Sequence, residues 1–287
     1  MERSADVHAE TAGADRLGQR EGLPQPATRW GLAPMTRTLI VRAVQAAIVV
    51  LVLALWTMVG SRQTESQIIG TPNGVASWIW SWINGREGKG LYDLGRTLQG
   101  GFYGFLIGVV VGVPLAILLA SLRWVQQFAA PFVAVLNALP KLAVTPLFIL
   151  VFGNTLKAQA YFVGSGILFI AFYNVYTGLR SIDSVYVHNA RVLGASAVGL
   201  AREVYAPAIV GWLMTGLRLM VAWALTGAVV LEYLASTSGM GYLVATGQQL
   251  GVADQVIGAI LVVSAVALAA DRMLVLIERH YSKWRLA

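Results

Sequence analysis

The stretch LQGGFYGFLIGVVVGVPLAILLASL, residues 98–122, contains no charged side chain. About 20 apolar residues in a helix cross the hydrocarbon core of a bilayer, so this stretch predicts a transmembrane helix. Glycine recurs at every fourth position, at Gly100, Gly104, Gly108 and Gly112, which places these residues along one helix face. Small residues let another helix approach closely, and we expect this face to pack against a neighbouring helix rather than to bind a ligand.

Five further stretches have the same apolar character. The six predicted spans are residues 38–60, 98–122, 129–152, 158–179, 208–231 and 252–277. Of the 287 residues, 57% are hydrophobic and 12% are charged, whereas soluble domains carry about a quarter charged residues. The sequence therefore predicts an all-α membrane protein with six transmembrane helices. Residues 38–287 form the membrane domain, and residues 1–37, which are polar, form a disordered tail.

The basic residues predict the orientation of the chain. With the N-terminus inside, 14 Lys and Arg residues lie on the cytoplasmic side and five outside, while Lys141 and Arg218 lie within the spans. The positive-inside rule then places both termini and the polar segment 181–207 in the cytoplasm. The net charge of +7 reflects this orientation and does not indicate nucleic-acid binding. Outside, residues 75–83 predict an amphipathic helix in the membrane interface, with its tryptophans at headgroup level.

The composition excludes several kinds of chemistry. Without cysteine there are no disulfides, thiolate metal ligands or thiol nucleophiles, and the three histidines are scattered. No phosphate-binding loop of the form G-x-x-x-x-G-K-[ST] occurs, because residues 85–90 have the wrong spacing and lie outside. We therefore predict no catalytic residue, no metal site and no cofactor in this chain.

The segment between the fourth and fifth spans reads SIDSVYVHNARVLGASAVGLAREVYAP, residues 181–207. Its pattern predicts two short helices hinged at Gly194 and ended by Pro207. Ala190 and Gly194 share a helix face, where their small size lets a partner come close. The second helix, about residues 196–205, has one apolar and one charged side. The hairpin fits the cleft of a partner protein, or it packs on its own membrane domain.

The spacing of this segment resembles the cytoplasmic loop of binding-protein-dependent ABC importer permeases. That loop begins Glu-Ala-Ala-x-x-x-Gly and ends, after a hydrophobic residue, in Leu-Pro. Here Ala190 and Gly194 match, Val204 is the hydrophobic residue, and Ala206-Pro207 stands for Leu-Pro. His188 and Asn189 replace the first Glu and Ala, so no contact of that glutamate is carried over to this chain.

Other stretches are similar to the nitrate, sulfonate and taurine branch of these permeases. They are residues 138–153, residues 216–218 with Glu232, residues 239–242, and residues 271–285. Together with the hairpin they extend the resemblance over about residues 70–287. Four motifs in the right order, combined with six spans, make the resemblance specific.

The resemblance implies a type I ABC importer permease fold and a non-catalytic translocation subunit in the bacterial inner membrane. It also implies a homodimer with two ATPase subunits, which bind ATP and Mg²⁺, and a periplasmic or lipid-anchored binding protein. The solute would be small and anionic, such as a sulfonate, taurine, nitrate or a carboxylate. The ATPase would dock on the hairpin, with these candidate contacts: Asn189, Ala190, Gly194, Ala195, Ser196, Ala197, Leu200, Arg202 and Pro207.

Polar residues within the spans are costly and are candidates for a translocation path or gate. Lys141 follows Pro140, which breaks the helical hydrogen bonds; it attracts an anionic solute, or it pairs with freed carbonyls or a carboxylate. Glu232 ends the fifth span on the outer side, at a gate or a docking surface for the binding protein, or as a solvated carboxylate. Asn137 and Asn174 line a path or make interhelical hydrogen bonds.

Three further charges have structural interpretations. We expect Arg218 to be paired or to snorkel toward the headgroups, and Asp271 and Arg272 to serve only orientation and anchoring. A stand-alone ion-coupled secondary transporter is the alternative function. It predicts an inverted repeat and a buried acidic site, yet the sequence shows no clear repeat and no carboxylate near the middle of a span. A membrane-embedded enzyme would need a nucleophile or metal cluster, which the sequence also lacks.

Overall fold

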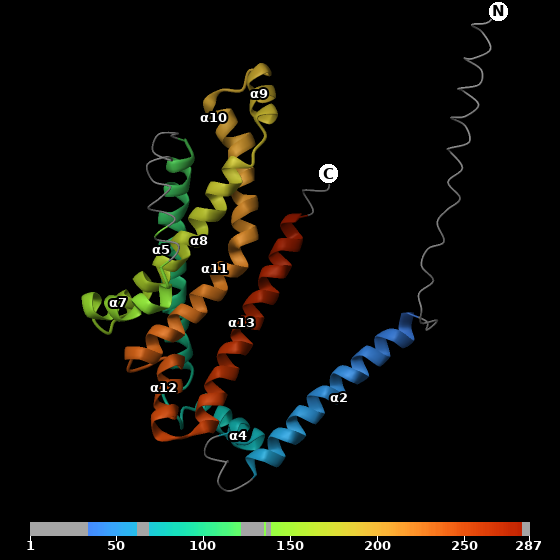
Figure 1. The fold of residues 1–287 in the computed structure, drawn as a ribbon, viewed down its shortest axis with the longest axis vertical. Coiled ribbons are helices and arrows are strands. Elements are labelled where there is room, and N and C mark those ends of the chain that lie inside the picture. Colours follow the sequence, from blue (N-terminus) through green and yellow to red (C-terminus); the bar gives the residue numbers. More distant parts are fainter. Residues whose placement is uncertain (1–33, 62–68, 122–134, 136–138, 283–287) are drawn as a thin grey trace, which may run out of the picture. The chain divides into compact units, whose positions relative to one another are not determined.

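The computed structural model describes residues 34–61, 69–121, 135 and 139–282, and these residues form helices joined by turns (Figure 1). The chain divides into two compact units, Met1–Ala54 and Leu55–Ala287. Helix α2 (Pro34–Gly60) forms the first predicted span and begins at Pro34, slightly before the predicted start. Residues 1–33 of the predicted tail lie outside the described residues.

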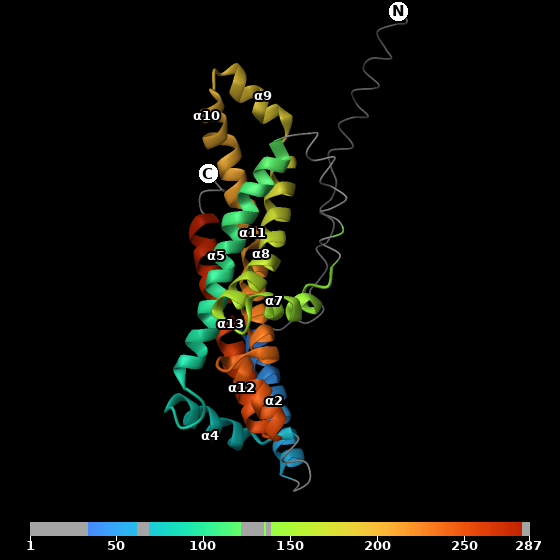
Figure 2. The same ribbon diagram turned by 90° about the vertical axis from the view of Figure 1, so that its left-hand side faces the viewer.

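The second unit contains one amphipathic helix, four long helices and several short ones. In chain order they are α4 (Pro72–Ile83), α5 (Leu91–Ser121), η2 (Lys141–Val144), α7 (Thr145–Phe152), α8 (Leu156–Arg180), α9 (Ser184–Val192), α10 (Ala197–Leu200), η3 (Ala201–Tyr205), α11 (Ala206–Ala235), α12 (Met240–Leu250) and α13 (Ala253–Ser282). Helices α9 and α10 lie at one end of this unit, and α4 and α12 lie at the opposite end (Figures 1 and 2).

Within the described residues, five helical stretches are long and apolar enough to cross a membrane: α2, α5, α8, the continuous stretch from α10 to α11, and α13. These correspond to five of the predicted spans, and the all-α fold class is confirmed. The remaining prediction, residues 129–152, falls largely outside the described residues. Its described part consists of a 3₁₀ turn, η2, followed by the short apolar helix α7.

The glycine stripe of α5 faces α8, and the two helices pack closely along it. A Cβ atom on Gly108 would lie 2.6 Å from the Cβ of Ile167 and 2.8 Å from the carbonyl oxygen of Gly164. The stripe is buried along its length, and Val163 and Ile167 of α8 are fully buried beside it. The predicted role in helix packing is confirmed, because side chains at these positions would force the helices apart.

Helix α4 is amphipathic, as predicted, but two of its tryptophans do not face outward. Trp78 and Trp82 are 7% and 2% exposed, and they pack in a cluster with Met240 and Ala259. The third tryptophan of α4, Trp80, points away from the protein, with 68% of its surface exposed. The indole rings of Trp78 and Trp82 therefore contribute to the packing of α4 against α12 and α13, and the depth of α4 in the membrane interface stays a prediction.

Candidate functional site

The hairpin turns at Gly194, as the sequence predicts. Gly194 has a φ of +86°, a conformation that residues with a side chain rarely adopt. Its N–H donates to the Arg191 carbonyl at 3.0 Å, and the Ala195 N–H donates to the Ala190 carbonyl at 3.0 Å. These two bonds form a Schellman motif, which ends α9 and reverses the chain.

Side-chain caps start both helices of the hairpin. The Asp183 carboxylate accepts from the Val185 N–H at 2.9 Å at the start of α9, and the Ser196 hydroxyl oxygen accepts from the Gly199 N–H at 3.1 Å at the start of α10. Each cap satisfies an N–H group that would otherwise lack a partner in the first turn. Local sequence therefore determines the shape of the hairpin.

Pro207 does not end the second helix, which corrects the prediction. Helices α10, η3 and α11 are continuous, and Pro207 lies in the first turn of α11. The segment η3 is a π-helical turn in which the Ala206 N–H donates to the Ala201 carbonyl. Proline has no backbone N–H to donate to the preceding turn, and the helix passes through the π turn and continues without that hydrogen bond. The second arm of the hairpin is thus one end of the fifth predicted span and is joined to it without a break.

The first arm and the turn are open to solvent. No residue of α9 is buried, and Leu193 at the turn is 87% exposed. Val192 and Val198 beside it are also exposed, so an apolar tip projects from the chain. The alternative of a hairpin packed on its own domain is wrong for α9 in this chain.

The candidate contacts on the hairpin differ in their accessibility. Leu200 is buried within the chain and is not available to a partner, which corrects its place among the contacts. Ala190 and Ala195 are half-buried. The exposed candidates are Asn189, Gly194, Ser196, Ala197, Arg202 and Pro207.

Lys141 has a partner that the sequence did not suggest. It opens η2 directly after Pro140, and its ammonium lies 5.8 Å from the centre of the Phe169 ring of α8. A cation over an aromatic face is attracted by the ring, so this contact orients Lys141 toward α8. The lysine is half-buried, which leaves part of its charge accessible.

Of the two asparagines predicted to line a path, the structure describes only Asn174. The Asn174 amide donates to the Ile170 carbonyl of its own helix at 2.8 Å, and its amide group packs against Gly216 of α11. Among the described residues, Asn174 makes no interhelical hydrogen bond, so this alternative is not found there. Asn137 lies outside the described residues.

Glu232 is buried, with 1% of its surface exposed. Its carboxylate accepts from the Thr97 hydroxyl at 2.7 Å, from the Gln159 amide at 2.8 Å and from the Gly241 N–H at 3.1 Å. The alternative of a solvated carboxylate is wrong, and Glu232 is also not part of an exposed docking surface. The partners come from α5, α8 and the start of α12, which no local sequence signal could link to Glu232.

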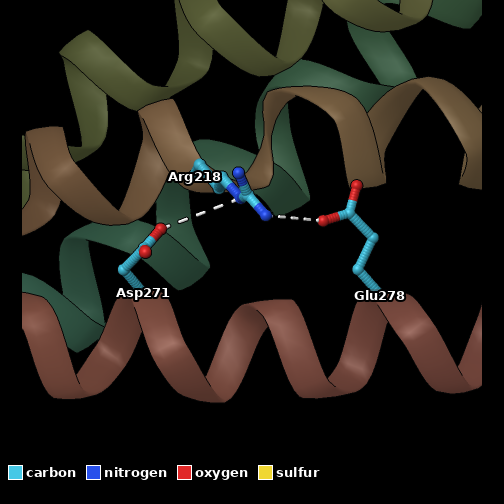
Figure 3. Close-up of polar contacts among 3 residues, drawn as sticks. All are labelled: Arg218, Asp271 and Glu278. Atoms are coloured by element: carbon cyan, nitrogen blue, oxygen red, sulfur yellow. Dashed lines mark hydrogen bonds and ion pairs between the residues drawn. The ribbon is translucent and has the colours of Figure 1, made fainter. Parts of the chain in front are cut away.

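Arg218 of α11 pairs with two carboxylates of α13, as Figure 3 shows. The guanidinium lies 2.9 Å from Glu278 and 3.8 Å from Asp271. A spacing of seven residues places both carboxylates on one face of α13. The predicted pairing of Arg218 is confirmed, whereas the assignment of Asp271 to anchoring alone is wrong because Asp271 also contributes to the link between α11 and α13.

An apolar groove of about 500 Å³ lies between α5, α11 and α13. Phe102 and Phe105 line it from α5, Val221 from α11, and Met273 from α13. All of its described lining residues are apolar.

Comparisons with known proteins agree with the fold and with the family that the sequence resembles. Residues 104–283 match the family described as "Binding-protein-dependent transport system inner membrane component". The chain is 28% identical over 235 residues to the putative aliphatic sulfonates transport permease protein SsuC of Bacillus subtilis, covering 82% of this chain and 84% of that protein. It is 32% identical over 218 residues to the riboflavin transport system permease protein RibX of Chloroflexus aurantiacus, covering 76% and 80%.

A solved structure shares the fold. A chain of the MetNI methionine ABC transporter, determined in inward-facing conformations, aligns with a TM-score of 0.52 over 64% of this chain and 94% of that chain. The sequence identity is 16%, so the likeness concerns the fold alone. The type I ABC importer permease fold that the resemblance implied is thereby confirmed.

Proposed function

Because this chain belongs to the binding-protein-dependent transport system inner membrane component family, the permeases of ABC importers, we propose that its hairpin, residues 181–207, is where a separate ATPase docks. The observation that carries this proposal is the exposed apolar tip formed by Val192, Leu193 and Val198. Exposed apolar clusters on a rigid turn are typical of protein interfaces. A cleft in a nucleotide-binding subunit would cover this tip.

The continuous second arm supplies the mechanical link. Helices α10, η3 and α11 run without a break, so a displacement of the tip moves the inner end of α11 directly. In the proposed cycle, two copies of this chain stand on two ATPase subunits in the bacterial inner membrane. ATP binding closes the ATPase pair and draws the two hairpins together, which rocks the spans from inward-open to outward-open. Hydrolysis resets them, and this chain performs no covalent chemistry.

The proposed solute is a small sulfonate-like anion, delivered by a binding protein on the outer side. The relative SsuC is named for aliphatic sulfonates, and the sequence predicts that the basic, half-buried Lys141 lies within a membrane span. The relative RibX is named for riboflavin, so a screen of the binding protein should include a flavin beside the sulfonates.

The decisive experiment compares two exposed leucines, one at the hairpin turn and one at the end of α12. Leu193→Glu places a charge in the apolar tip, and Leu250→Glu places the same charge at the last residue of α12, where Leu250 is also exposed. Each tagged variant is purified from its native membranes in mild detergent, and an ATPase with a phosphate-binding loop is sought by mass spectrometry. We expect the ATPase with wild type and Leu250→Glu, and at least a tenfold loss with Leu193→Glu.

A second pair of variants tests the turn. Valine strains the backbone at the φ of Gly194, so Gly194→Val should abolish ATP-driven uptake while expression stays largely intact. Asparagine tolerates this conformation, and Gly194→Asn should retain uptake. Full uptake by Gly194→Val, or equal ATPase recovery with Leu193→Glu, would count against docking at the hairpin. Repeated recovery of the wild-type chain alone would favour the stand-alone transporter.

A further inference from the structure

Helix α12 begins without a cap of its own. Its N-cap residue is Gly239, which has a φ of +109° and no side chain to accept a hydrogen bond. The first N–H groups of a helix have no partners within the helix, and they carry the positive end of its dipole. Buried at this position, such groups need acceptors from elsewhere in the chain.

The acceptors come from two long helices. The Gly239 N–H donates to the Asp93 carboxylate at 3.0 Å, the Met240 N–H donates to the Thr97 hydroxyl oxygen at 2.9 Å, and the Gly241 N–H donates to the Glu232 carboxylate at 3.1 Å. Asp93, Thr97 and Glu232 are each 1% exposed. Two residues of α5 and one of α11 therefore cap α12 in a buried site.

The two carboxylates depend on this cap. Among the described residues, neither Asp93 nor Glu232 forms an ion pair, and the groups that face their oxygens are N–H and O–H donors and the positive end of the α12 dipole. A buried charge without donors is costly, and separating α12 would remove a donor from each carboxylate. The cap therefore resists any motion of α12 relative to α5 and α11.

Helix α8 joins the same site. The Gln159 amide donates to Glu232 at 2.8 Å and to the Ala228 carbonyl at 3.3 Å. Close packing adds to the hydrogen bonds, because a Cβ atom on Gly241 would overlap the carbonyl oxygen of Val229. Glu232 thus lies where α5, α8, α11 and α12 meet.

We propose that Glu232 is a positioning residue that fastens α12 to α5, α8 and α11, so that these four helices move as one body during transport. The transport part rests on the proposed function, whereas the fastening itself does not. Glu232 then acts through α12 and touches no solute. The motif Gly239-Met240-Gly241 serves to bring backbone N–H groups against the carboxylates.

The fastening is tested by hydrogen exchange on the purified full chain in lipid nanodiscs. Glu232→Leu removes both acceptor oxygens, and Glu232→Gln keeps the shape but loses the charge. We expect the amides at the start of α12 to exchange at least tenfold faster in Glu232→Leu and severalfold faster in Glu232→Gln. The control Glu203→Leu, at an exposed carboxylate of η3, should leave them unchanged. If Glu232→Leu fails to fold, the test uses Glu232→Gln alone. The proposal is overturned if the α12 amides of Glu232→Gln exchange at the wild-type rate.

The common motion is tested by a cross-link. The Tyr233 hydroxyl of α11 contacts the Gln248 side chain of α12, and the chain has no cysteine of its own. Tyr233→Cys and Gln248→Cys are introduced together and joined by a bifunctional thiol reagent in the reconstituted importer. We expect uptake of ethanesulfonate to stay within twofold of the unlinked protein. Loss of uptake after cross-linking would refute the proposal that α12 moves as one body with α5, α8 and α11.

Rescue separates positioning from a merely structural role. Glu232→Gln should lower uptake, and the same cross-link should restore most of it, because the link replaces the lost attachment of α12. Failure of the link to restore uptake would overturn the positioning role. Absence of uptake in the unlinked wild type, with protected α12 amides, would instead count against the proposed function.

Discussion

Replacing Gly108 with alanine adds one methyl group to the seam between α5 and α8. The new Cβ atom would lie 2.6 Å from the Cβ of Ile167 and 2.8 Å from the carbonyl oxygen of Gly164. Carbon atoms pack best at about 3.5–4.0 Å, so α8 would have to move by about 1 Å. The carbonyl belongs to the backbone and cannot turn aside as a flexible side chain can.

The expected free-energy change is a difference of two effects. Overpacking a well-packed core costs about 1–3 kcal/mol, while replacing glycine by alanine inside a helix contributes about 0.5–1 kcal/mol of stability. A shift of α8 also weakens the packing of the fully buried Val163 and Ile167. We therefore expect Gly108→Ala to lower the free energy of unfolding by about 1–2 kcal/mol.

Gly95 is the matched control, because it lies on the same helix and a Cβ atom there would meet nothing within 4 Å. Gly95→Ala should leave stability unchanged or raise it by up to about 1 kcal/mol. Unfolding is measured by titration with dodecyl sulfate in mixed micelles, followed by the fluorescence of the nine tryptophans. A Gly108→Ala variant as stable as the wild type would refute the inference that close backbone contact with α8 leaves no room for a side chain at residue 108.

Two further stability predictions use the same titration. Trp78→Ala should lower the free energy of unfolding by about 3–5 kcal/mol because the ring is buried, whereas the exposed Trp80→Ala should change it by less than about 0.5 kcal/mol. Similar losses for both would contradict the burial of Trp78. Arg218→Ala leaves Asp271 and Glu278 without their cation, and should cost about 1–2 kcal/mol, against less than about 1 kcal/mol for Glu278→Gln, which retains the pair with Asp271. The reverse order would show that Arg218 does not join α11 to α13.

Local patterns in the sequence predicted a large part of this protein. The apolar stretches predicted five described spans, the glycine spacing predicted the packing face of α5, and Gly194 predicted the turn of the hairpin. Each signal depends on residues close together in the chain, because helix period, span length and turn conformation are local properties. The hairpin motif added the family, which the match of residues 104–283 confirmed.

Tertiary structure alone decided which groups meet. Glu232 is 135 residues from Thr97 and 73 from Gln159, so no spacing rule links it to its partners. Trp78 is buried because α12 and α13 pack against it, and the helix continues through Pro207 because a π turn precedes it. Burial and hydrogen-bond partners arise from packing between helices distant in sequence, whereas the helices themselves follow from neighbouring residues. The chain therefore specifies its spans locally, and only the packed fold makes a capping ligand out of a carboxylate at the end of a span.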